Sequence, residues 1–115
     1  MTPKPKDFDP LLLESIDEAL QSLGESVKIS IYFHLEKNFS VHRSDIPTHL
    51  DEFQNGLEKI FGLGARFLEI LIMKNLYARI ECPLNIGENV QMEFVKYVES
   101  AKQSYLKGCH SENNC

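Results

Sequence analysis

The sequence predicts an all-α protein, a compact bundle of about five helices. Apolar residues recur every three or four positions in several stretches, which is the spacing of one helical face. Glycine, proline and helix-capping residues separate these stretches. The chain has 115 residues, of which 43% are hydrophobic and 25% are charged, and these values are typical of one globular domain.

The first helix is predicted to begin at Asp9, a good N-cap, with Pro10 at the first helical position and Gly24 as its stop. Its apolar face consists of Leu13, Ile16, Leu20 and Leu23. Residues 1–8 before it are expected to form a flexible lead, and residues 9–81 the helical core domain.

Residues 27–36 fit two structures. Apolar and polar residues alternate almost perfectly in this segment, and several are β-branched, as in a strand. However, Val27, Ile31 and Leu35 also share one helical face. Because a single strand among helices would leave its backbone groups unpaired, a largely buried helix is the preferred interpretation.

Two further helices complete the predicted core domain. One is expected to begin near Thr48, which has the spacing of a capping box with Asp51, and to end at Gly62. The other follows Gly64 over residues 65–80 and is apolar around much of its circumference, as expected for the central helix of a domain. Its carboxylates, including Glu69, alternate with basic residues, a mixture typical of a solvated face.

Residues 82–108 are predicted to form a C-terminal amphipathic helix that runs from about Glu88 to Lys107. Its apolar stripe supplies the candidate interaction residues, which are Val90, Phe94, Tyr97, Val98, Ala101 and Tyr105. This helix either folds back and completes the core, or projects and offers the stripe to a partner or to a second copy in a homodimer. Residues 109–115 are expected to form a flexible tail.

Composition narrows the classes of function. The net charge of −5 argues against phosphate-driven binding of nucleic acid. The longest apolar stretch, residues 67–73, is far shorter than the roughly 20 residues of a membrane span. The basic N-terminus is not followed by a long apolar segment, and the odd count of three cysteines does not suggest a disulfide framework. A cytoplasmic location is therefore expected.

No group of residues predicts a catalytic centre, a metal site or a cofactor. A lone His34 could sense pH or hold a small ligand or haem, but a satisfied histidine at the edge of the core is the preferred interpretation. The spacing of His34, His42 and His49 matches no zinc pattern. Gly62 and Gly64 lack the rest of a phosphate-binding fingerprint and are interpreted as a tight turn.

The C-terminal tail contains three potential soft metal ligands, Cys109, His110 and Cys115. They are interpreted as incidental surface residues, since a flexible tail offers no preformed coordination geometry.

One pattern of residues extends over about residues 11 to 80. Its segments are Leu11–Leu20, Gly24–Lys28, Ile31–Lys37, Ile46–Pro47, Phe53, Leu57–Gly62 and Gly64–Tyr77. In these segments the chain resembles a group of small archaeal helical domains called Nitrosopumilus output domains. The resemblance implies a helical output module in signalling or regulation, with no assigned activity and no functional residues to carry over.

The sequence and this resemblance together predict a non-enzymatic module for protein–protein contacts in archaeal signalling or regulation, which self-associates as a homodimer. Two alternatives are a DNA-binding transcriptional regulator and a sensor of a small ligand or haem.

Overall fold

The computed structural model describes residues 8–82 and 93–107, and every regular element in these ranges is helical. The α-helices are α1 (Phe8–Gln21), α2 (Glu25–Phe39), α3 (Leu50–Phe61), α4 (Ala65–Ile80) and α5 (Phe94–Lys107). Two short 3-10 helices, η2 (Arg43–Thr48) and η3 (Gly62–Gly64), precede α3 and α4. The prediction of an all-α bundle is confirmed. In the described ranges, no helix has both the length and the apolar character that a membrane span needs.

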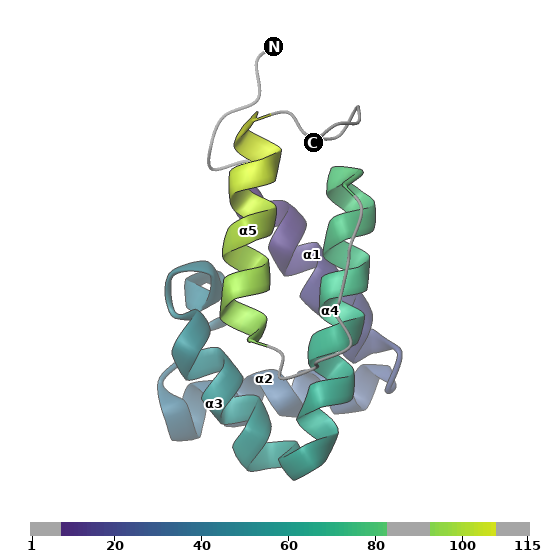
Figure 1. Ribbon diagram of the computed structural model, residues 1–115. Coiled ribbons are helices and arrows are strands. Elements are labelled where there is room, and N and C mark those ends of the chain that lie inside the picture. Colours follow the sequence, from purple (N-terminus) through teal and green to yellow (C-terminus); the bar gives the residue numbers. More distant parts are fainter. Residues whose placement is uncertain (1–7, 83–92, 108–115) are drawn as a thin grey trace.

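Helix α4 lies at the centre of the bundle. It packs most extensively on α1 and also contacts α5 and α3. Figure 1 shows α1, α4 and α5 along one part of the molecule, with α2 and α3 across the opposite end. The apolar side chains that α4 buries are Ala65, Leu68, Ile72, Met73, Leu76, Tyr77 and Ile80. This breadth of burial agrees with the central place predicted from its sequence.

Residues 27–36 belong to α2, so the helical interpretation is correct and the strand alternative is wrong. A helix pairs its backbone groups internally and needs no neighbouring strand. The helix is less buried than expected, because only Ile31 and Leu35 are buried on it. Val27, on the same predicted face, is 39% exposed. Part of the contact between α2 and α1 is polar, since the Tyr32 hydroxyl donates to Asp17 at 2.5 Å.

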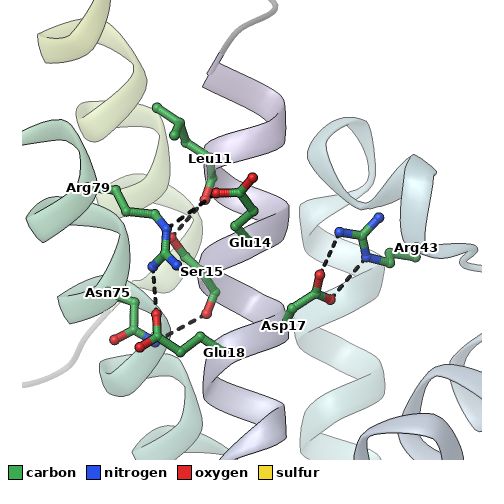
Figure 2. Close-up of polar contacts among 8 residues, drawn as sticks. All are labelled: Leu11, Glu14, Ser15, Asp17, Glu18, Arg43, Asn75 and Arg79. Atoms are coloured by element: carbon green, nitrogen blue, oxygen red, sulfur yellow. Dashed lines mark hydrogen bonds and ion pairs between the residues drawn. The ribbon is translucent and has the colours of Figure 1, made fainter.

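Polar contacts on α1 join it to elements on two sides (Figure 2). The Arg43 guanidinium, on η2, donates from Nε and Nη2 to the two carboxylate oxygens of Asp17 at 3.0 and 2.6 Å. Arg79, on α4, donates from Nη1 to Glu18 at 2.7 Å. Because the guanidinium donates to both carboxylate oxygens, the contact fixes the orientation of the two groups in addition to pairing their charges.

The start of α3 differs from the prediction. The helix begins after His49, which makes no side-chain cap. Thr48 lies in η2, where its hydroxyl donates to the Asp45 carbonyl at 3.0 Å. The predicted capping box of Thr48 and Asp51 is therefore wrong. The predicted end is correct, since Gly62 terminates α3 with a φ of 60°.

Helix α5 packs against α3 and α4 of its own chain and does not project. Its buried side chains are Phe94, Val98 and Ala101. The Phe94 ring packs on Phe53 of α3, with ring centroids 6.2 Å apart. The helix begins at Phe94, and the start predicted near Glu88 lies outside the described residues.

The burial of α5 can be tested with two substitutions that shorten a side chain to alanine. Phe94→Ala removes a fully buried ring and is expected to lower the free energy of unfolding by about 3–5 kcal/mol. Leu106→Ala, on the same helix but 46% exposed, should cost less than about 1 kcal/mol. Urea denaturation followed by circular dichroism measures both values. Similar small costs for the two variants would contradict the packing of α5 on the core.

The Asp17 contacts predict an acid-dependent contribution to stability. Burial acts to raise the pKa of Asp17, but the hydrogen bonds from Arg43 and Tyr32 outweigh it and hold the pKa below its ordinary value. A carboxylate with a lowered pKa stabilises the fold above its unfolded pKa, and this stabilisation is lost as the pH falls through the folded pKa.

Asp17→Asn is therefore expected to lower the free energy of unfolding by about 1–2 kcal/mol at pH 7, a value discounted for the partial exposure of Arg43. At about pH 2.5 the deficit relative to wild type should shrink. Urea denaturation at the two pH values measures it, with Glu52→Gln on the exposed face of α3 as the control. An equal deficit at both pH values would show that the ionised carboxylate contributes nothing.

Candidate binding site at the α3–α4 corner

The apolar stripe predicted as a contact surface lies against the core of its own chain. Phe94, Val98 and Ala101 are buried, Tyr97 and Tyr105 are half-buried, and Val90 lies outside the described residues. The Tyr105 ring packs on Phe8 of α1, with ring centroids 6.0 Å apart. The described part of the stripe thus leaves little apolar surface for a partner.

The histidines lie on the surface in separate local contacts. His34 is exposed rather than at the edge of the core, and its ring meets Phe33 edge-on. His42 Nδ1 lies 3.1 Å from a carboxylate oxygen of Glu36, and His49 contacts η2. Among the described residues, no three His, Cys, Asp or Glu side chains group closely enough to hold a metal. The tail residues Cys109, His110 and Cys115 lie outside the described ranges.

The most exposed large apolar side chains lie where α3 turns into α4. Leu63, in η3, is 91% exposed, and Phe67, in the first turn of α4, is 77% exposed. Ile60, near the end of α3, is 36% exposed. Gly62, with its φ of 60°, ends α3 in a conformation that glycine adopts readily, and Leu63 follows it in η3.

A second exposed apolar group lies on α2 and consists of Val27, Ile29 and Phe33. Part of this group has cover from its own chain, because the Lys37 ammonium lies 5.8 Å from the centroid of the Phe33 ring.

An open pocket of about 440 Å³ lies at the α3–α4 corner. Its lining residues are Glu58, Gly62, Leu63, Ala65, Arg66 and Glu69. Two carboxyl groups therefore share a pocket whose rim carries the exposed Leu63. The tight turn predicted for Gly62 and Gly64 is present, and the carboxyl groups beside it disfavour a phosphate.

Glu69 is the unusual residue of this pocket. Only 3% of the residue is exposed, and its Oε2 atom has no hydrogen-bond partner among the described residues. Burial raises the pKa of Glu69 to about 7, and the charge of Glu58 adds to the increase. A hydrogen bond from the Gln54 side chain and the charge of Arg66 act in the opposite direction.

The Oε2 atom of Glu69 is therefore a hydrogen-bond acceptor to which no group among the described residues donates. At neutral pH the Glu69 carboxyl exists in comparable amounts of its protonated and ionised forms, because its pKa lies near 7. A buried polar atom without a partner costs about 1–3 kcal/mol. A ligand that donates a hydrogen bond, or carries a positive charge, would remove this cost.

The sequence interpretation placed Glu69 on a solvated face, and that interpretation is wrong. A usable signal was present, because Glu69 lies three and four residues from Ile72 and Ala65, both on the buried face of α4. The position of a carboxyl within an apolar stripe therefore predicts its burial better than the presence of basic residues nearby predicts its exposure.

No family model, no curated protein and no solved structure matches this chain. The resemblance to Nitrosopumilus output domains therefore stays a prediction.

The raised pKa of Glu69 makes stability depend on pH in a defined direction. Because the folded pKa of about 7 lies above the ordinary 4.5, this effect stabilises the fold fully below pH 4.5. The stabilisation declines as the unfolded chain ionises and is lost as the pH rises through about 7. At about 1.4 kcal/mol for each pKa unit, the loss amounts to about 3 kcal/mol.

The glutamine side chain in Glu69→Gln cannot ionise, so the free energy of unfolding of this variant should not show the decline with rising pH. Urea denaturation at pH values from about 4.5 to 8 is expected to show that the advantage of wild type over the variant falls by up to about 3 kcal/mol. Glu52→Gln, which removes an exposed carboxyl of α3, should keep the wild-type profile. Parallel profiles for wild type and Glu69→Gln would contradict the raised pKa.

Proposed function

We propose that the chain is a non-enzymatic protein-interaction module in signalling or regulation, and that it contacts its partner through the α3–α4 corner. The observation that carries the proposal is the exposure of Leu63 and Phe67 at a corner whose pocket is lined by the buried Glu69. Exposed apolar side chains around a polar recess form the usual composition of an interface, in which apolar anchors surround a specific polar contact.

The corner is preferred to the other surfaces for three reasons. The stripe of α5 is largely occupied by the core of its own chain. On α2, the Phe33 ring already has the Lys37 side chain over it. Leu63 and Phe67 are also more exposed than any of the apolar residues of α2.

Neither alternative function gains a supporting observation. Several basic groups that DNA binding would need are paired with carboxylates, namely Arg43 with Asp17, Arg79 with Glu18 and Lys96 with Glu93. A haem or small-ligand sensor would need His34 in a pocket, and His34 is exposed on α2.

Site-specific photo-crosslinking in the native cells tests the proposal. A photoreactive phenylalanine analogue at position 63 should give a discrete adduct, and the same analogue at Lys102, on the exposed surface of α5, should not. Phe67→Glu should abolish the adduct while circular dichroism shows an unchanged fold, since position 67 is exposed. The mass of the adduct distinguishes a second copy of the chain from a different protein. Adducts of equal yield at both positions, unaffected by Phe67→Glu, would contradict the proposal.

A further inference from the structure

We infer that the pocket beside Leu63 binds the ammonium group of a lysine side chain supplied by the partner protein, an inference that rests on the proposed function. The observation behind it is Glu69, a lining residue of the pocket that is only 3% exposed and whose Oε2 atom has no hydrogen-bond partner in the described part of the chain.

The chemistry of the pocket requires a donor. Glu69 and Glu58 are both acceptors when ionised, and the charge of Glu58 disfavours the ionisation of Glu69. An ammonium group carries three donors and a full positive charge, so it can satisfy Oε2 and relieve the repulsion between the two carboxylates. A neutral donor would satisfy the hydrogen bond but leave the repulsion.

Other ligand classes fit less well. An anion would meet the two carboxyl groups, and only Arg66 among the lining residues is basic. A calcium ion takes six to eight oxygen ligands, whereas the pocket offers the carboxyls of Glu58 and Glu69 with the amide of Gln54 nearby. Among the described residues, no group of three His, Cys, Asp or Glu side chains is present there.

The wall of the pocket favours lysine in particular. Leu63 and Ala65 line it together with Glu58 and Glu69, so its lining divides into apolar and acidic residues. A lysine side chain has the same division, because an aliphatic stem leads to a compact charged end. The stem would pack on Leu63 while the ammonium reaches Glu69.

Binding of a cation should draw the proton from Glu69. The groups that face this carboxyl are Glu58 and Gln54 on α3 and Arg66 on α4, and of these Glu58 raises the pKa while the other two lower it. The affinity for an ammonium group should therefore increase as the pH rises from about 6 to 8. This direction distinguishes the pocket from an exposed carboxylate, which is ionised throughout that range.

The test uses n-butylammonium chloride, which reproduces the lysine stem and its charged end, with the full chain labelled with nitrogen-15. At constant ionic strength, we expect saturable chemical-shift changes for the backbone amides of Gly62, Leu63 and Arg66, with a dissociation constant on the order of millimolar. Neutral n-butanol, of the same length, should leave these amides unchanged. Glu69→Gln should weaken the binding at least ~10-fold, the equivalent of one charge-assisted hydrogen bond.

Matched variants make the result decisive. Glu58→Gln changes an exposed residue of α3, so it should fold and weaken the binding even if Glu69→Gln does not fold. Glu52→Gln, also exposed on α3, should leave the affinity unchanged. Shifts that do not saturate, that spread over all acidic residues, or that persist in Glu58→Gln would overturn the inference.

The result is separable from that of the proposed function. An adduct at position 63 without butylammonium binding would overturn the lysine assignment and leave the partner contact in place. Butylammonium binding without an adduct would remove the partner contact, and with it the assignment of the cation to a partner's lysine.

Discussion

Helix α4 has to bury apolar side chains on several sides at once, and the arrangement of the other helices follows from this constraint. Its contacts with α1 are the most extensive, and α5 and α3 cover further parts of its surface. The polar contacts of Arg79 with Glu18, and of Asn75 with the Ser15 carbonyl, add direction to the α1–α4 packing (Figure 2). Phe67, in the first turn of α4, nevertheless remains 77% exposed, although Ala65 and Leu68 beside it are buried.

The sequence was sufficient for the helical class of each described element and for the end of α3, but not for the bounds of α1. That helix begins at Phe8, which was predicted to lie in the flexible lead, and it ends at Gln21, so that Leu23 lies outside it and is 43% exposed. Gly62 has no side chain to oppose a positive φ, so it ends α3 as predicted. Residues 27–36 show a strand-like alternation although they are helical, and burial explains why. Helix α2 buries only Ile31 and Leu35, and a helix with so narrow a buried face has a weak 3.6-residue apolar pattern. The capping box failed because Thr48 and Asp45 bond within η2, a local alternative that spacing alone does not reveal.

The candidate site was harder to predict because burial is set by other helices. The local sequence around Glu69 is an apolar run with one charge, and nothing in that run specifies which helix will lie over each face. α3 returns against α4 through the turn at Gly62, and this brings Glu58 and Gln54 close to Glu69. The packing of α5 stayed open at the sequence level for the same reason, since the same periodicity describes a helix that completes the core and one that projects.

Phe67 is exposed and Glu69 is buried, which is the opposite of the arrangement that stability alone would favour. Transferring a large ring from water to an apolar environment is favourable by about 1.5–3 kcal/mol, and the exposed Phe67 forgoes most of that gain. Glu69 adds the cost of a desolvated, unpaired carboxyl oxygen. Both costs arise two residues apart on one helix, and both would be removed by a partner that covers the ring and donates to the carboxyl. Since binding energy is the difference between the free and bound states, residues that weaken the isolated corner in this way are expected to contribute strongly to recognition.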